Sequence, residues 1–190
     1  MKQQRAIILD RDGVILETVE GYLDNPNSAI FIPGSIDALC VLLAHDIPLG
    51  LATNQAGIAA GEVAQDQVAA IQRLIDGVLL DQTGRSFKAV RVCPHAKDAG
   101  CSCRKPKPGL LLAAANDMSV DPANCVYVGD YSDDWRASIN ADMLPVLVRP
   151  GRGRLAELDI RSWYPGPFVR ALTFDSLSSA LPFLLDWTSR

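Results

Sequence analysis

The stretch AIILDRDGVI, residues 6–15, places two aspartates directly behind four aliphatic residues. A continuous apolar run of this length predicts a buried strand of a parallel sheet, because such strands are covered on both faces. Side chains at positions i and i+2 of an extended chain point the same way, so we expect Asp10 and Asp12 to project together and Arg11 to point away. Two close carboxylates repel each other unless they share a cation or a proton. Taken alone, the stretch is equally consistent with an acidic turn that has no function.

The composition of the chain limits what it can do. With 190 residues, of which 48% are hydrophobic, the chain can bury a core as one domain. Its net charge of −4 argues against a nucleic-acid partner. No apolar segment approaches the roughly 20 residues of a membrane span, and the N-terminal residues lack the pattern of a signal peptide. We therefore expect a cytoplasmic monomer that binds neither nucleic acid nor a membrane.

Strand-like and helical patterns alternate along the chain. Short apolar runs rich in β-branched residues predict strands at residues 6–10, 47–53, 88–93, 125–129 and 144–148. Apolar residues at three- and four-residue spacing predict helices at residues 34–46, 62–81, 109–118 and 134–143. The alternation predicts an α/β fold, a Rossmann-like parallel sheet with helices on both faces and ligands at the carboxyl ends of its strands. Residues 150–167, rich in Gly, Pro and Arg, are expected to form a long surface connection before a last strand near residues 170–174.

Acidic residues follow another predicted strand as well. Asp130, Asp133 and Asp134 come directly after the fourth predicted strand. Because the carboxyl ends of parallel strands meet at one edge of a sheet, we expect Asp130 to lie near Asp10 and Asp12. Three converging carboxylates are costly without a divalent cation, and hard oxygen ligands suit Mg²⁺. The pattern predicts a magnesium site, although an acidic turn in solvent explains this second stretch equally well when it stands alone.

Groups that can bind a phosphate occur at the same predicted edge. Thr53, Asn54 and Gln55 end the second predicted strand with a hydroxyl and two amides, and Arg104 and Lys105 supply cations. Hydroxyl donors and cations are what a bound phosphate needs. A turn that caps the following helix is the alternative explanation for residues 53–55.

Three of the five cysteines lie within eleven residues. Cys93, His95, Cys101 and Cys103 provide three thiolates and an imidazole, a set that can close tetrahedrally around Zn²⁺. The spacing is not that of the CxxC knuckle of zinc fingers. A closed set of four protein ligands leaves no position for water, so the predicted zinc is structural. A redox role for the thiols is the alternative.

The polar segments together resemble a known superfamily. DRDGV at 10–14, Thr53 of TNQ, Lys105 of RKPKPG and GDYSDD at 129–134 match, in order, the four motifs of the haloacid dehalogenase superfamily. TNQAGIAAG, CPH, CSCRKPKPGLL and VGDYSDD resemble its branch of heptose-bisphosphate and histidinol-phosphate phosphatases. The resemblance implies the haloacid dehalogenase fold without a large cap domain. It also implies a single phosphatase domain over residues 1–190 with a small zinc-binding loop at residues 93–103.

The resemblance also implies a mechanism. Asp10 would be the nucleophile that forms an aspartyl-phosphate, and Asp12 would be the general acid and later the general base. Asp10, Asp130 and the main-chain carbonyl of Asp12 would hold Mg²⁺. Asp134 would orient the metal ligands or the binding-site lysine. The substrate would be bound by Thr53, Asn54, Gln55, Arg104 and Lys105.

For the substrate, the resemblance implies D-glycero-D-manno-heptose 1,7-bisphosphate, hydrolysed at C7. Arg104 fits a second anionic group better than the cationic amine of histidinol phosphate. Histidinol phosphate or another small phosphorylated metabolite is the alternative substrate, and a catalytically silent zinc-binding interaction module is the alternative from another class. Val14, where the heptose enzymes carry Thr, and the short AKDAG segment between His95 and Cys101 depart from the pattern of the branch.

Overall fold

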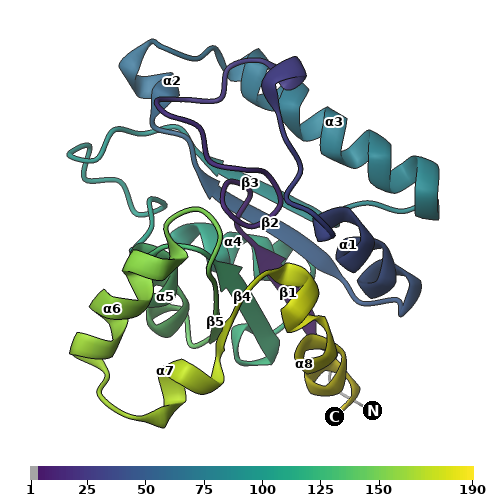
Figure 1. Cartoon of the computed structure of the whole chain (residues 1–190). Helices are drawn as coiled ribbons and strands as arrows, with labels where there is room; N and C mark the ends of the chain where they lie inside the picture. Colours follow the sequence, from purple (N-terminus) through teal and green to yellow (C-terminus); the bar gives the residue numbers. More distant parts are fainter. Residues whose placement is uncertain (1–3) are drawn as a thin grey trace.

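The computed structural model describes residues 4–190, and its central feature is a six-stranded parallel sheet in the order β3-β2-β1-β4-β5-β6 (Figure 1). The strands are β1 (Ala6–Leu9), β2 (Leu49–Asn54), β3 (Ala89–Cys93), β4 (Cys125–Gly129), β5 (Leu144–Val148) and β6 (Thr173–Phe174). All five neighbouring pairs run parallel. The predicted α/β fold and each predicted strand are confirmed.

The acidic stretch follows the central strand of the sheet. Every residue of β1 is fully buried, as its unbroken apolar run predicts. Leu9 is in register with Leu51 of β2 and Val128 of β4, so Asp10 emerges between the ends of these two strands. The chain moves outward from β1 to β3 and then crosses back to β4, and ligands of open α/β sheets bind at such a reversal of strand order.

Helices cover both faces of the sheet, as the alternating pattern predicts (Figure 1). One apolar core lies under α1 (Ser35–Ala44), α3 (Gln65–Thr83) and α8 (Leu177–Ser189). A second core lies under α4 (Gly109–Asp117) and α5 (Ser132–Asn140). The short elements are α2 (Gly57–Ala60) and the 3₁₀ turns η1 (Pro26–Ser28) and η2 (Pro122–Asn124). No helix within residues 4–190 has the length and apolarity to cross a bilayer.

The prediction of a long surface connection over residues 150–167 is wrong. This segment contains α6 (Gly153–Trp163), and α7 (Pro167–Ala171) begins at its end. Ala156 and Ile160 lie one turn apart on α6 and are buried in a third apolar cluster. That cluster also contains Trp135, Leu147, Val169 and Leu172. The Gly and Pro residues that indicated a loop lie just before α6, between the two helices, or at the first positions of α6 (Gly153) and α7 (Pro167), where they do not prevent a helix.

The segment between β1 and α1 is where the chain passes over the carboxyl edge of the sheet. Within it the structure has only η1 and isolated bridges that pair Leu16 with Asp12 and with Phe31. No second folded unit is inserted among the described residues, which confirms the prediction that a large cap domain is absent. The segment also supplies one wall of the pocket described below.

Candidate active site

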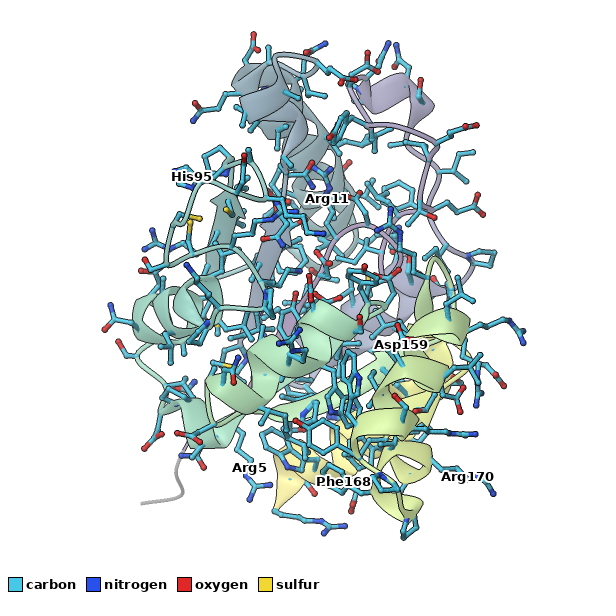
Figure 2. All side chains as sticks on the ribbon, turned by 90° about the vertical axis from the view of Figure 1, so that its left-hand side faces the viewer. Arg5, Arg11, His95, Asp159, Phe168 and Arg170 are labelled. Carbon is cyan, nitrogen blue, oxygen red and sulfur yellow. The ribbon has the colours of Figure 1, made fainter. Side chains whose placement is uncertain are left out.

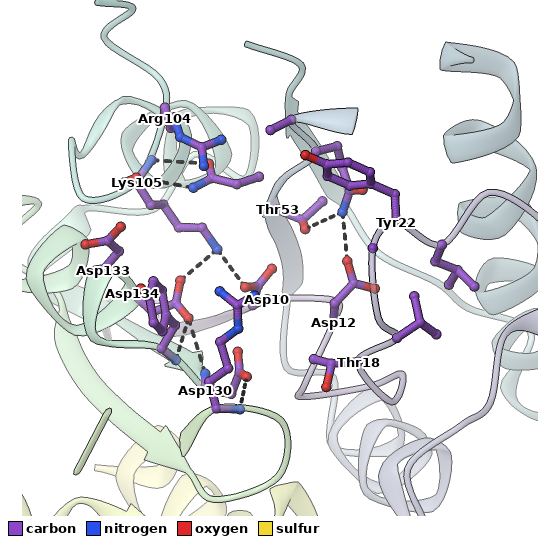
Figure 3. A pocket seen from close by; sticks show the side chains of 18 residues that line it. Asp10, Asp12, Thr18, Tyr22, Thr53, Arg104, Lys105, Asp130, Asp133 and Asp134 are labelled. Atoms are coloured by element: carbon purple, nitrogen blue, oxygen red, sulfur yellow. Dashed lines mark hydrogen bonds and ion pairs between the residues drawn. The ribbon is translucent and has the colours of Figure 1, made fainter. Parts of the chain in front are cut away.

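A pocket of ≈ 310 Å³ opens at the carboxyl ends of β1, β2 and β4 (Figure 3). It brings together the predicted site residues Asp10, Asp12, Thr53, Asn54, Gln55, Arg104, Lys105, Asp130 and Asp134. Segments that are far apart in the sequence therefore converge where the topology of the sheet predicts. The predicted zinc ligands form a separate cluster, in the loop that leads from β3 to Lys105.

Lys105 lies at the centre of this pocket, with only 2% of its surface exposed. Its Nζ is 2.8 Å from Asp10 Oδ2 and 2.8 Å from Asp134 Oδ1, and Figure 3 shows the side chain reaching between these two carboxylates. The same ammonium donates to the hydroxyl of Tyr127 at 2.7 Å and to the carbonyl of Ala52 at 3.1 Å. One buried cation thus fixes the position of Asp10 relative to the strands beneath it.

The electrostatics of the pocket follow from burial. Burial raises the pKa of Asp10 to about 6, although the Lys105 ammonium acts in the opposite direction. Burial alone would lower the pKa of Lys105, but the carboxylates of Asp10 and Asp134 outweigh it and raise that pKa. At neutral pH the pair is therefore a carboxylate beside an ammonium.

Asp134 uses both of its oxygens to hold other groups. Its Oδ1 contacts Lys105, and its Oδ2 accepts hydrogen bonds from the backbone N–H groups of Asp130 (3.2 Å) and Tyr131 (3.0 Å). These contacts set the direction in which Asp130 leaves β4. Asp134 therefore contacts both Lys105 and the backbone that carries Asp130.

The donor set at this edge fits a hard divalent cation. Carboxylate oxygens of Asp10, Asp130 and Asp134 lie within 4.8 Å of one another. Burial, with the charges of Asp134 and Asp10, raises the pKa of Asp130 well above its usual range, because grouped carboxylates are costly without a cation. Asp130 Oδ2 accepts a hydrogen bond from the backbone N–H of Arg152 at 2.8 Å. The carboxylates of Asp10, Asp130 and Asp134 are thus a group that could hold Mg²⁺.

The backbone crowds around Asp130. Gly13 has φ +84° and Gly151 has φ +61°, and a Cβ placed on either would lie 2.2 Å from Asp130 Oδ2. A Cβ on Gly153 would lie 1.8 Å from the carbonyl oxygen of Val148. The turn after β5 can approach the acid this closely only because glycine occupies these positions.

Arg11 does not point away from Asp12, which contradicts the expectation from strand alternation. Its Nε and Nη2 donate to the two carboxylate oxygens of Asp12, each at 3.0 Å, and Arg11 is only 1% exposed. The physical reason is that β1 ends at Leu9, so the alternation of side chains no longer holds at residues 10–12. Gln55 Nε2 donates to Asp12 Oδ2 at 2.8 Å, so Asp12 accepts three hydrogen bonds.

The polar residues at the end of β2 make different contacts. Thr53 Oγ1 accepts a hydrogen bond from Gln55 Nε2 at 3.0 Å, so Gln55 ties Thr53 to Asp12. The Asn54 side chain donates to the main-chain carbonyl of Lys105 and accepts from its N–H, both at 3.2 Å. In this arrangement Asn54 fixes the backbone of Lys105, and the hydroxyl of Thr53 is the group of β2 that faces the nucleophile across the pocket (Figure 3).

The cysteine cluster has the geometry of a metal site. Cys93 Sγ is 3.3 Å from Cys103 Sγ and 3.8 Å from Cys101 Sγ, and His95 Nδ1 is 3.5 Å from Cys93 Sγ and 3.3 Å from Cys103 Sγ. A tetrahedral zinc with Zn–S bonds of about 2.3 Å separates its sulfur ligands by about 3.8 Å. Figure 2 shows His95 beside the sulfur atoms at the edge of the molecule, with Arg11 in the interior. The predicted ligand set is one that can bind zinc.

Several pocket residues were not predicted. Thr18, Val19 and Tyr22 come from the segment that follows β1, and Tyr131 and Arg152 lie near Asp130. Arg152 follows the end of β5, so the rule that ligands bind at carboxyl ends of strands could have identified it. Tyr127, the hydroxyl partner of Lys105, lies within an apolar strand and gives no signal of its own in the sequence.

The sheet order and this acidic pocket define a phosphatase of the haloacid dehalogenase class, and comparisons with known proteins agree. A family model described as HAD-hydrolase-like matches residues 102–173. The D-glycero-beta-D-manno-heptose-1,7-bisphosphate 7-phosphatase of Pseudomonas putida is 35% identical over 92% of this chain and 96% of that protein. The Bordetella bronchiseptica protein of the same name is 39% identical over 79% of this chain and 83% of that protein.

A solved structure supports the same relationship. The crystal structure of D,D-heptose 1,7-bisphosphate phosphatase from B. bronchiseptica, complexed with magnesium and phosphate, has a TM-score of 0.83 and 34% identity, and the match covers 96% of this chain and 99% of that chain. This chain belongs to the haloacid dehalogenase superfamily and, within it, to the family of these heptose-bisphosphate phosphatases. It is a phosphoric monoester hydrolase.

Proposed function

We propose that this chain removes the C7 phosphate of D-glycero-D-manno-heptose 1,7-bisphosphate through an aspartyl-phosphate on Asp10. The observation that carries the reaction is the buried contact of Asp10 Oδ2 with Lys105 at 2.8 Å, on the floor of a pocket that also contains Thr53 and Asp130. The substrate follows from relatives that match nearly the whole chain. We further propose that residues 1–190 act as one phosphatase domain, as a monomer in the cytoplasm.

Asp10 begins the reaction. Its carboxylate attacks phosphorus, the bond from phosphorus to the C7 oxygen breaks, and the electron pair leaves with that oxygen. Lys105 and Thr53 bind the phosphoryl oxygens, where negative charge accumulates. Held by Asp10, Asp130 and the main-chain carbonyl of Asp12, Mg²⁺ supplies positive charge that screens the nucleophile from the phosphate.

Asp12 moves the proton in both half-reactions. It donates a proton to the departing C7 oxygen and later takes one from the water that attacks phosphorus, which breaks the bond to Asp10 and releases phosphate. Arg11 and Gln55 already donate three hydrogen bonds to Asp12. Protonation of Asp12 displaces one of these donors. Proton transfer from Asp12 to the leaving oxygen therefore includes a rearrangement of the hydrogen bonds that Asp12 accepts.

The choice of substrate is tested by comparing heptose 1,7-bisphosphate with histidinol phosphate at the same Mg²⁺ concentration. We expect kcat/KM for the bisphosphate to be at least about 10-fold higher, because a cationic amine cannot replace an anion beside Arg104. Release of inorganic phosphate measures both reactions. EDTA should stop turnover and added Mg²⁺ should restore it. Equal kcat/KM values for the two substrates would show that the chain is a phosphatase with no preference for the heptose bisphosphate.

The zinc loop should affect catalysis by positioning Arg104 and Lys105 in the pocket. Cys103 lies two residues before Lys105, so a metal held by the cluster also fixes the backbone that carries Arg104 and Lys105. We expect Cys101→Ala to lose zinc and to raise KM about 10-fold, with a smaller decrease in kcat. Metal analysis and steady-state kinetics measure the two effects.

Cys40→Ala is the matched control for the loss of a thiol. Cys40 lies on α1, and its Sγ contacts Gln82 rather than the cluster. This variant should keep zinc and wild-type kinetics. A Cys101→Ala protein without zinc but with unchanged KM and kcat would show that the cluster does not position the pocket.

A further inference from the structure

The turn after β5 brings to the pocket a cation that the sequence motifs do not include. Arg152 lies between β5 and α6, and it lines the same pocket as Asp10 and Lys105. Its backbone N–H donates to Asp130 Oδ2 at 2.8 Å, and this hydrogen bond fixes the position of the Arg152 backbone. The side chain is exposed, whereas Lys105 is buried. Arg152 therefore belongs to the mouth of the pocket and Lys105 to its floor.

The guanidinium of Arg152 is oriented by an aromatic ring. Its Cζ lies 5.2 Å from the centroid of the Tyr131 ring, the geometry of a cation–π contact. Within the described part of the chain, no hydrogen bond uses an N–H of the Arg152 guanidinium, so its donors are available to a ligand. No carboxylate of residues 4–190 forms an ion pair with Arg152. A guanidinium held beside an aromatic ring and with unused donors is suited to bind two oxygens of one phosphate.

The position decides which phosphate Arg152 can reach. The phosphoryl group that is transferred must lie at Asp10, where Lys105 and the 2% exposed Thr53 already supply a cation and a hydroxyl. Arg104 is half-buried at the mouth of the pocket, and its Nη1 donates to the carbonyl of His95 at 3.3 Å. Arg152 reaches the mouth from a different strand, with all of its side-chain donors unused. A substrate that extends from the floor to the mouth meets this guanidinium at its far end.

We infer that Arg152, stacked on Tyr131, is a specificity-determining residue that binds the second phosphate of a sugar bisphosphate, at the end remote from the scissile bond. The inference rests on the proposed function for the identity of the sugar. It predicts that discrimination between a bisphosphate and the corresponding monophosphate depends on Arg152 in addition to Arg104, while the chemistry at Asp10 does not depend on Arg152.

The test compares Arg152→Gln with the wild-type protein on heptose 1,7-bisphosphate and on heptose 7-phosphate. For the bisphosphate we expect kcat/KM to fall about 10- to 100-fold, mainly through KM, because a charge-assisted bidentate contact is lost. For the monophosphate we expect a change below about 3-fold. Arg152→Lys should recover part of the loss, because lysine restores the charge without the planar fork.

Two further variants separate the role of the ring from that of the charge. Tyr131→Phe keeps the aromatic face and should lower kcat/KM for the bisphosphate less than Tyr131→Ala does. Tyr131→Ala removes the face and should lower kcat/KM for the bisphosphate by a smaller factor than Arg152→Gln does. Arg154→Gln is the matched control, because this exposed arginine lies two residues further on and does not line the pocket. It should change neither reaction.

Each outcome bears on the inference. An equal decrease on both substrates would mean that Arg152 serves the reacting phosphate or the fold, and an unchanged bisphosphate reaction would mean that it binds nothing; either result overturns the inference. The same comparison with fructose 1,6-bisphosphate and fructose 6-phosphate keeps the two proposals distinguishable. Suppose that the wild-type protein does not hydrolyse the heptose substrates but prefers fructose 1,6-bisphosphate to fructose 6-phosphate, and that Arg152→Gln abolishes this preference. The heptose assignment then fails and the role of Arg152 stands.

Discussion

Asp10→Asn is expected to lower kcat by about 10⁴-fold or more while the protein still folds. The amide has nearly the same shape as the carboxylate, but it cannot attack phosphorus to form an acyl phosphate. Folding should survive because Lys105 keeps Asp134 as its partner, at 2.8 Å, and the mutual repulsion of Asp10 and Asp134 is removed. Steady-state phosphate release and a thermal melt measure the two parts of this prediction.

A trapping experiment makes the test specific for the nucleophile. Acid quenching of wild type during turnover of a phosphate-labelled substrate should leave label on the protein, and the Asp10→Asn variant should carry none. Asp24→Asn, in the exposed segment between β1 and α1, is the control and should keep wild-type kinetics. Substantial turnover by a pure Asp10→Asn protein would show that another group attacks phosphorus.

Lys105→Met should damage both stability and activity. It removes the ammonium that contacts Asp10 and Asp134, and it leaves two buried carboxylates without a cation. Breaking such a buried pair costs about 3–5 kcal/mol of the free energy of unfolding. Loss of a cation at the phosphoryl oxygens should lower kcat/KM by about 10³-fold. Urea denaturation and steady-state kinetics at the same Mg²⁺ concentration measure these changes.

The stability deficit of Lys105→Met should depend on pH. Burial already raises the pKa of Asp10 to about 6 in the presence of Lys105, and without the ammonium that pKa rises further. Because the folded variant keeps the Asp10 proton up to a higher pH than folded wild type does, its deficit should shrink as the pH falls from above that raised pKa to about 6, and should stay constant below it. Lys88→Met removes an exposed lysine before β3 and is the control. A variant at Lys105 as stable as this control would contradict the role assigned to the ion pair.

Local patterns were sufficient for most of the fold. The apolar run of β1 and its two neighbours in the sheet predict parallel strands because burial on both faces requires continuous apolar residues. The acids that follow β1 and β4 converge because the carboxyl ends of parallel strands share one edge. Most of the candidate site follows from these two rules and the resemblance of its motifs.

The parts that the sequence did not predict depend on contacts between distant segments. Arg11 turns back to Asp12 because the strand ends at Leu9, and the exact end of a strand is set by its neighbours. Helix α6 forms over a segment rich in Gly and Pro because Ala156 and Ile160 find a buried surface on α5 and β5. The strand-end rule places Arg152 at the edge of the sheet, but its contact with Asp130 depends on how the turn after β5 packs, which the sequence pattern does not give.

The glycines around Asp130 have a consequence for how such an enzyme can change its substrate during evolution. Gly151 and Gly153 leave no room for a side chain, whereas Arg152 between them projects from an otherwise fixed backbone. A side chain at Gly151 would collide with the Asp130 carboxylate and one at Gly153 with the Val148 carbonyl, but mutation at Arg152 alters only what is presented at the mouth. New substrate preferences can therefore arise at this one codon without passing through an inactive ancestor.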